Sequence, residues 1–218
     1  MKKITLIAIL FLITSTAFAQ WEIGLKITPS IATNRVVGLR DLDFKSLNAK
    51  TRFGGGVTAD YFFGPNYAFS TGLIYNSRGA GVSFKPTATA TNRESDEFNL
   101  QYLEIPVTIK LYTNDIAPDT KVYFQAGGSL DTRMAARVNR EKLDASDEKY
   151  AKRFNLFDIS VLLGAGVERQ LGESTKVFGG LSYHRGLFDV DDYYEERFSN
   201  KNIEIKNTYV ALDLGIKF

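Results

Sequence analysis

His184 is the only histidine of this chain, and its imidazole is the group best suited to acid–base chemistry near neutral pH. Ser182 lies two residues earlier, so both side chains share one face if the segment is a β-strand. A carboxylate from another strand would complete the activated nucleophile of a hydrolase or acyltransferase. The alternative is a histidine held in a polar network without a catalytic role. We favour the network, because spacing alone does not place a nucleophile on a base, and we expect no catalytic residue and no enzyme.

Clustered acids near residue 190 are the candidate for metal binding. Carboxylate oxygens are the ligands that Ca²⁺ prefers, but the glycine-centred twelve-residue spacing of calcium loops is absent. We favour a solvated loop and expect no metal and no cofactor, while Ca²⁺ binding stays the alternative for this segment. Its members are Asp189, Asp191, Asp192, Glu195 and Glu196, around Tyr193 and Tyr194.

Two basic clusters offer a different chemistry, the binding of phosphate groups. If they lie near an outer leaflet, they would meet lipopolysaccharide, and otherwise they form a solubilising surface. The first cluster holds Arg35, Arg40, Lys45, Lys50 and Arg52, and the second holds Arg140, Lys142, Lys149, Lys152 and Arg153. Gly164-Ala165-Gly166 is not a phosphate loop, because it opens no helix, and we interpret it as close packing.

Composition excludes several functions. The absence of cysteine excludes a disulfide scaffold, a thiolate metal site, a cysteine nucleophile and a lipid-modified cysteine anchor. A formal charge of +2 over 218 residues is too weak for a nucleic-acid binder. A mean hydropathy of −0.15 excludes a membrane protein built from many helices.

The first nineteen residues have the pattern of a secretory signal peptide. Lys2 and Lys3 are followed by an apolar run that is too short for a spanning helix, which needs about 20 residues. Ala17-Phe18-Ala19 then supplies small residues before a cleavage point at Gln20. We expect residues 1–19 to be removed and residues 20–218 to form one domain without formal net charge.

The rest of the chain alternates between apolar and polar residues with a period of two, which is typical of strands, and no segment has a convincing helical pattern. The clearest example covers residues 103–112, where every odd position is apolar. We predict eight strands, over residues 21–33, 51–64, 67–84, 97–113, 121–138, 154–171, 175–190 and 203–218.

The connections between these strands alternate strictly in length. Three are short and rich in turn residues, at 64–66, 114–120 and 172–174. Four are long and charged, at 34–50, 85–96, 139–153 and 191–202. All short turns and both termini therefore fall at one end, as in outer-membrane barrels with periplasmic turns and long external loops. We predict an all-β fold, an eight-stranded antiparallel up-and-down transmembrane β-barrel with periplasmic termini.

The two faces of the strands favour a membrane barrel over a soluble one. The polar face carries small residues, which fit a narrow lumen, and aromatic residues gather on the apolar face near the short turns. Because buried charges of mixed sign are costly unless paired, we expect ion pairs across a closed lumen. The charges are Glu22, Lys26, Asp60, Arg78, Glu104, Lys110, Asp131, Arg133, Asp158, Glu168, Asp213 and Lys217. The glycines are Gly24, Gly56, Gly72, Gly127, Gly164, Gly166, Gly180 and Gly215. The aromatics are Trp21, Tyr61, Phe63, Tyr67, Phe69 and Phe218.

Residues 102–110, Tyr-Leu-Glu-Ile-Pro-Val-Thr-Ile-Lys, resemble the "YLEIPxxxK" strand of PorT-like, porin-family outer-membrane β-barrel domains of Bacteroidetes-type bacteria. The terminal Leu-Gly-Ile-Lys-Phe is similar to the insertion signal of outer-membrane proteins. This resemblance implies a barrel in the cell outer membrane of a Gram-negative envelope. It also implies contact with the barrel-assembly machinery through the C-terminal strand.

We therefore expect a small outer-membrane barrel with a largely closed polar lumen and a structural or interaction role. Its expected partners are outer-membrane lipid, lipopolysaccharide and a protein at the external loops, with no nucleic acid. The main alternative is a narrow transport or protein-secretion-associated, PorT-like barrel. A hydrolase or acyltransferase around His184 and a secreted soluble ligand-binding barrel are weaker alternatives.

Overall fold

The computed structural model describes residues 20–38, 40–144, 147–200 and 202–218. The predicted signal peptide, residues 1–19, lies outside the described residues, so its cleavage and the domain start at residue 20 stay predictions.

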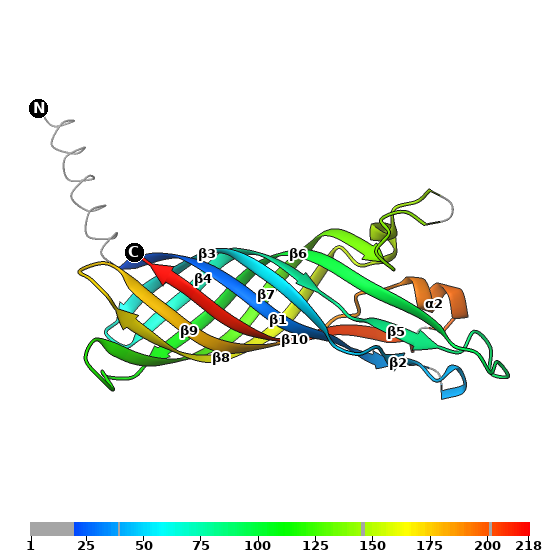
Figure 1. The fold of residues 1–218 in the computed structure, drawn as a ribbon, viewed down its shortest axis with the longest axis horizontal. Helices are drawn as coiled ribbons and strands as arrows, with labels where there is room; N and C mark the ends of the chain where they lie inside the picture. Colours follow the sequence, from blue (N-terminus) through cyan, green and yellow to red (C-terminus); the bar gives the residue numbers. More distant parts are fainter. Residues whose placement is uncertain (1–19, 39, 145–146, 201) are drawn as a thin grey trace, which may run out of the picture.

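Eight long antiparallel strands close into a barrel, which confirms the predicted fold (Figure 1). Their order around the barrel is β1-β3-β4-β6-β7-β8-β9-β10, and β10 pairs with β1 to close the ring. The strands are β1 (Trp21–Val37), β3 (Lys50–Gly64), β4 (Tyr67–Arg78), β6 (Glu94–Tyr112), β7 (Thr120–Val138), β8 (Phe157–Gln170), β9 (Lys176–Gly186) and β10 (Glu204–Lys217). Each of these eight strands pairs with the next one along the chain. The register of the strand pairs is therefore set by the seven hairpins and by the one pairing of β10 with β1 that closes the barrel.

Long and short connections separate to opposite ends, as the sequence predicts. The C-terminus and the start of β1 lie at the end with the short turns, which we call the turn end (Figure 1). The long connections gather at the other end, beyond the closed part of the barrel, and there they form a compact structure that we call the loop-end cap. The cap contains β2 (Lys45–Ser46), β5 (Gly81–Phe84), α2 (Tyr193–Phe198) and two short 3-10 turns, η1 (Arg40–Leu42) and η2 (Tyr150–Arg153).

The predicted continuous strand over residues 67–84 is wrong, because the chain breaks between β4 and β5. Gly79 and Gly81 have φ values of +89° and +135°, which only glycine adopts readily. The side chain of Asn34 accepts hydrogen bonds from the backbone N–H groups of Ala80 (2.7 Å) and Gly81 (2.9 Å). The backbone N–H groups of Ala80 and Gly81 therefore do not take part in strand pairing at this point. Strand β5 turns into the cap, where it pairs with β2 and with the outer part of β6.

Helix α2 was not expected from the sequence, because six residues are too few to show a helical period. It ends at Ser199, which adopts the left-handed conformation with φ 50°. No helix among the described residues is long and apolar enough to cross a membrane.

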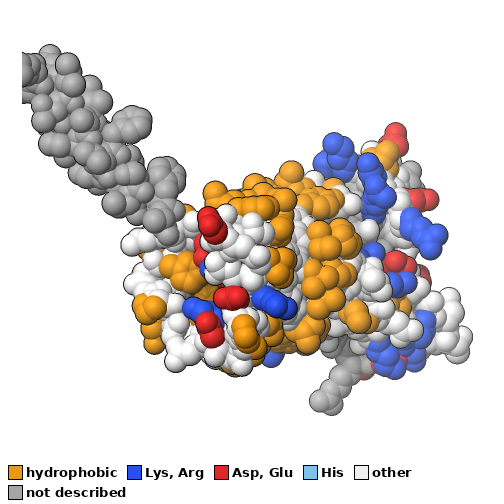
Figure 2. Space-filling view, turned by 60° about the vertical axis from the view of Figure 1, so that its left-hand side comes forward, with side chains coloured by type: hydrophobic (Ala, Val, Ile, Leu, Met, Phe, Trp, Pro, Cys, Tyr) orange, Lys and Arg blue, Asp and Glu red, His pale blue; other side chains and the backbone are white. Residues whose placement is uncertain are grey.

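The outer surface carries a belt of exposed apolar side chains around the barrel (Figure 2). Ile23, Leu25 and Ile27 on β1 are each half exposed or more, and alternate residues on the other strands behave alike. Lysine, arginine and acidic side chains gather at the cap (Figure 2). The predicted outward direction of the apolar face is therefore confirmed.

Candidate functional site

The polar face of the strands lines the lumen, where the predicted charges lie. Nine of the twelve are buried, namely Asp60, Arg78, Glu104, Lys110, Asp131, Asp158, Glu168, Asp213 and Lys217. Glu22, Lys26 and Arg133 are partly buried. Lys26 pairs with Asp213 at 3.2 Å, and Arg133 donates to the backbone carbonyl of Asn155 at 3.1 Å. The charges other than Arg133 and Asp158 form ion pairs, so the expected pairing holds for most of the set.

The first cluster lies around Arg78, near the cap. Its guanidinium group donates two hydrogen bonds to Asp131, at 2.7 and 3.0 Å, and also pairs with Glu104. The rings of Tyr102 and Tyr209 lie 5.1 and 4.9 Å from the guanidinium carbon. A fully buried arginine is thus neutralised by two carboxylates and enclosed by two aromatic rings.

His184 joins this same cluster through Tyr209. The Tyr209 hydroxyl donates to Glu104 at 2.8 Å and lies 2.6 Å from His184 Nδ1. On the other side of the ring, His184 Nε2 lies 3.1 Å from Ser182 Oγ. This orientation matches a general base beside a hydroxyl. However, Ser182 and His184 are only 4 % and 2 % exposed, so no substrate reaches them in this conformation.

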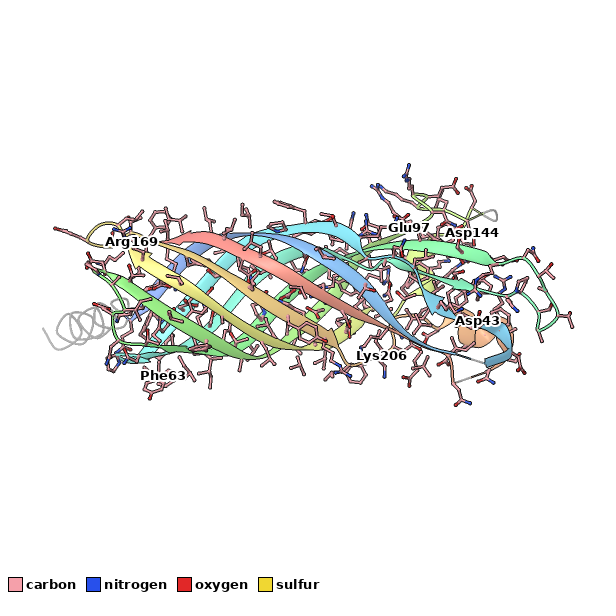
Figure 3. The ribbon with its side chains drawn as sticks, turned by 60° about the horizontal axis from the view of Figure 1, so that its bottom comes forward. Asp43, Phe63, Glu97, Asp144, Arg169 and Lys206 are labelled. Atoms are coloured by element: carbon pink, nitrogen blue, oxygen red, sulfur yellow. The ribbon has the colours of Figure 1, made fainter. Side chains whose placement is uncertain are left out.

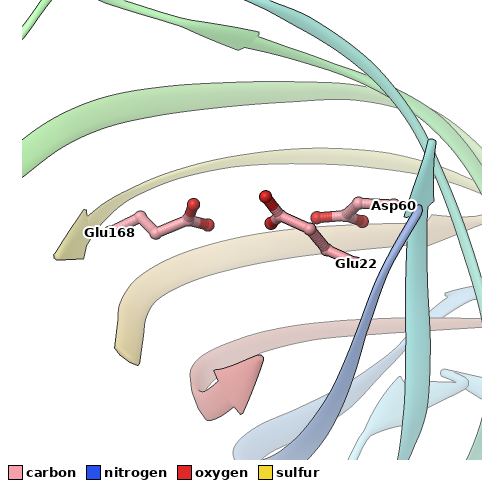
Figure 4. A group of neighbouring side chains, drawn as sticks. All are labelled: Glu22, Asp60 and Glu168. Atoms are coloured by element: carbon pink, nitrogen blue, oxygen red, sulfur yellow. The ribbon is translucent and has the colours of Figure 1, made fainter. Parts of the chain in front are cut away.

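The second cluster lies at the turn end and brings three carboxylates together, from Glu22, Asp60 and Glu168 (Figure 4). Their oxygens lie within 4.8 Å of one another, the one such group of potential metal ligands among the described residues. The Lys217 ammonium lies 2.6 Å from Asp60 and pairs with Glu168, and Lys110 lies 2.9 Å from Asp60. Lysines thus supply the positive charge that a metal ion would bring.

The second cluster is not predicted as a unit by the sequence. Glu22 on β1 and Asp60 on β3 are direct cross-strand partners, whereas Glu168 reaches them across the lumen from β8, which pairs with neither strand. The sequence pattern places all three carboxylates on the inward face of their strands and close to a short turn or to a chain terminus. That shared position is the feature from which the cluster could have been predicted.

Aromatic rings fill the lumen between the charges. Lys110 lies 5.5 Å from the ring centre of Tyr123, and Lys217 lies 5.6 Å from that of Phe178. A Cβ on Gly180 would lie 2.6 Å from the Tyr123 hydroxyl, and one on Gly215 would lie 2.3 Å from the Phe178 ring. The predicted role of the inward glycines is confirmed at these positions, because rings occupy the space of the missing side chains.

Little space remains inside. A cavity of about 20 Å³ lies beside Lys26, Lys110 and Asp213, enough for about one water molecule. A wider cavity of about 170 Å³ opens at the turn end beside Asp119, Glu168 and Lys176. Between this mouth and the cap, side chains and ion pairs of the described residues occupy the lumen.

The loop-end cap has an apolar core of its own. Phe84 packs against Phe44 and Tyr194 with ring centres 5.2 and 5.3 Å apart, and Tyr194 donates to Asp96 at 2.5 Å. The same core also contains Val82, Phe98, Leu100, Tyr102, Ala136, Val138, Phe154, Val190, Ile203 and Ile205. The expectation of a solvated fourth loop holds only in part. Asp192, Glu196 and Arg197 are exposed, whereas Asp191 and Tyr194 are buried against other segments of the cap.

The acids near residue 190 hold the cap together rather than meeting at one point. Asp191 accepts the backbone N–H of Tyr194 at 3.0 Å, and Asp189 accepts those of Asp191 and Ile205 at 3.2 and 2.9 Å. Asp192 accepts the side-chain amide of Asn155 at 3.2 Å. Burial raises the pKa of Asp191 to about 8 and that of Asp189 to about 6.

Most of the predicted phosphate-binding residues make contacts within the cap. Lys45 pairs with Asp43, Lys50 with Glu97, Lys152 with Glu148 and Arg153 with Asp144, while Arg52 donates to the carbonyls of Gly79 and Phe98. The side chain of Arg40 lies outside the described part. Lys142 and Lys149 line a surface groove with Met134 and Leu143, and Arg35 lies on β1.

A closed antiparallel barrel with an apolar belt, a polar lumen and long loops at one end defines the class of outer-membrane β-barrels. The sequence model described as "Outer membrane protein beta-barrel domain" matches residues 18–192, and the chain belongs to this family. Membership implies an outer-membrane location.

One solved structure supports the fold. Neisserial surface protein A has 14% sequence identity and a TM-score of 0.52, and the alignment covers 91% of this chain and 97% of that one. OprG from Pseudomonas aeruginosa has 13% identity and a TM-score of 0.47, with 89% and 96% covered. No curated protein matches the chain in sequence.

Proposed function

We propose that this protein is a closed outer-membrane barrel with a structural or interaction role, exerted through its loop-end cap. It is neither an open pore nor an enzyme. The observation that carries the proposal is the filled lumen, in which the Arg78 and Lys217 clusters lie at successive levels. Moving an ion along the axis would require breaking buried ion pairs, each break leaving an unpaired charge.

The partners proposed for this barrel follow from its surfaces. The apolar belt contacts outer-membrane lipid, and the cap presents exposed charges to lipopolysaccharide and to a protein partner. Phe218 and the alternating C-terminal strand are the proposed contact for the barrel-assembly machinery, with Phe218 58% exposed at the turn end.

The alternative role is a narrow transport or secretion-associated, PorT-like barrel. It rests on the strand over residues 102–110, whose inward residues Glu104 and Lys110 belong to the two lumen clusters. Leu103, Ile105 and Val107 face outward along the same strand. Lumen filling and lipid contact thus account for this motif without a secretion activity, so we rank the closed barrel first.

Conductance in planar lipid bilayers tests the proposal. The wild-type protein, inserted from detergent and verified as folded by faster migration of the unboiled form on gels, should give no single-channel steps at neutral pH. The variant Arg78→Ser/Lys217→Ser removes both cluster centres and is the control for detecting an opened lumen. Steady steps from the folded wild type would overturn the closed-barrel proposal and favour transport.

A further inference from the structure

Three cationic side chains lie side by side on the outer face of the barrel, where it meets the cap. They are Arg35 on β1, Lys206 on β10 and Arg185 on β9, and we call them the cationic patch. Lys206 is the direct cross-strand partner of Arg35, and Arg185 is that of Thr208. Like charges directly opposite each other destabilise a sheet, so their position needs a compensating anion.

The groups within the protein compensate this charge only in part. Lys206 pairs with the partly exposed Glu204 at 2.7 Å. Arg35 donates to Thr208 Oγ1 at 3.3 Å and to the backbone carbonyl of Gly186 at 2.7 Å, both uncharged groups. Arg185 is exposed and has no hydrogen-bond or ion-pair partner within the described part of the chain. The patch keeps a net charge of about +2 by this count.

Apolar surface adjoins the patch on part of its border. Tyr183 and Leu187 flank Arg185, and Val37 follows Arg35 on the cap side, all at least 37% exposed. The other outward neighbours, Thr33, Thr208 and Glu204, are polar. An apolar groove begins nearby, lined by Phe157, Ile159 and Phe188 among others. On β8, Ile159 of this groove and Val161 are successive outward-facing residues, and Val161 is the cross-strand partner of Arg185. The groove therefore lies next to the cationic patch. Cations flanked by lipid-facing side chains are costly unless an anion meets them.

We propose that the cationic patch binds the phosphate group of an outer-leaflet lipid. Two guanidinium groups and one ammonium group match phosphate, which arginine recognises with paired hydrogen bonds. The adjoining apolar surface receives the acyl chains, so the ligand is a phosphorylated lipid and not free phosphate. This inference rests on the membrane placement of the proposed function but not on the closed lumen.

The chain offers a matched control for the test. Arg169 on β8 is, like Arg185, an exposed arginine on the outer face, but it lies at the turn end (Figure 3). Lys206, also labelled there, lies where the barrel meets the cap. Arg185→Gln and Arg169→Gln therefore remove the same charge at opposite ends of the belt. Neither loses a hydrogen bond described here, so both variants should fold.

The experiment is native mass spectrometry of the detergent-solubilised protein with dioleoyl phosphatidic acid or dioleoyl phosphatidylcholine. We expect Arg185→Gln to weaken phosphatidic acid binding about tenfold, the effect of losing one strong ionic contact. Arg169→Gln should bind as the wild type does, and phosphatidylcholine should not distinguish the three proteins.

Three results would overturn the inference. The first is equal phosphatidic acid binding by the wild type and Arg185→Gln, and the second is an equal loss in Arg169→Gln. The third is displacement of the lipid by millimolar inorganic phosphate, which would indicate a site for free anions. Each variant is first checked for faster migration when unboiled, and conductance is measured separately, so failure of the closed-barrel proposal is recognised independently.

Discussion

At the scale of single residues, the parity of each strand is enough to predict which charges face the lumen, but not which ones pair. Arg78 on β4 pairs with Glu104 on the adjacent β6 and with Asp131 on β7, one strand further around the barrel. Such contacts depend on strand tilt and on the register around the barrel, which no local pattern encodes. The same holds for His184, whose face is predicted from sequence but whose partner Tyr209 is not.

Removing the Arg78 guanidinium should destabilise the barrel strongly. Arg78→Met leaves Glu104 and Asp131 buried and unpaired, which costs about 3–5 kcal/mol. Reversible urea unfolding in detergent or lipid measures this change. Lys152→Met is the control, because its pair with Glu148 is exposed and contributes at most about 1 kcal/mol. Equal effects of the two substitutions would contradict the assigned role of the buried cluster.

Asp191 should make the cap sensitive to pH. Because burial raises its pKa to about 8 from the ordinary value of 3.8, the folded cap prefers the protonated carboxyl. The cap is therefore most stable relative to its open form at low pH, and it loses this stability as the pH rises from about 4 to about 8. Proteolysis within residues 191–200 should accelerate several-fold between pH 6 and pH 8.5. Asp191→Asn, which stays neutral, should remove most of that difference, and an unchanged pH profile in the variant would refute the explanation.

At the scale of elements, the eight strands and the sorting of their connections could be predicted, because a two-residue period is local to each strand. The break at Gly79 could not, since it depends on Asn34, a residue 45 positions earlier that caps the freed backbone groups. The cap was also missed. Its core joins residues from four connections, each too short or irregular to show a period.

Strand packing inside the barrel should tolerate no side chain at Gly215. A Cβ there would lie 2.3 Å from the Phe178 ring and 2.4 Å from the Leu25 carbonyl oxygen. We expect Gly215→Ala to destabilise the barrel by about 1–3 kcal/mol, as overpacking does. Gly172→Ala is the control, because a Cβ at that turn meets nothing within 4 Å. A urea midpoint for Gly215→Ala that equals the control's would show that the lumen is looser than described.

At the scale of the whole molecule, the nearly neutral mean hydropathy is consistent with a membrane barrel when the outer and inner faces of the strands are considered separately. A mean hydropathy of −0.15 averages an apolar outer belt, a charged lumen and a polar cap surface. A soluble barrel has the same average with its faces exchanged. The exposed belt, at residues such as Ile31 and Leu181 that are about 60% exposed, distinguishes the two.

Heat-modifiable gel migration of the protein extracted from outer-membrane fractions tests this placement most directly. A closed membrane barrel stays folded in detergent until boiled, so the unboiled protein should appear only in the detergent extract and should migrate faster than the boiled protein. Recovery of the protein in the soluble fraction without detergent, with identical migration before and after boiling, would contradict the account.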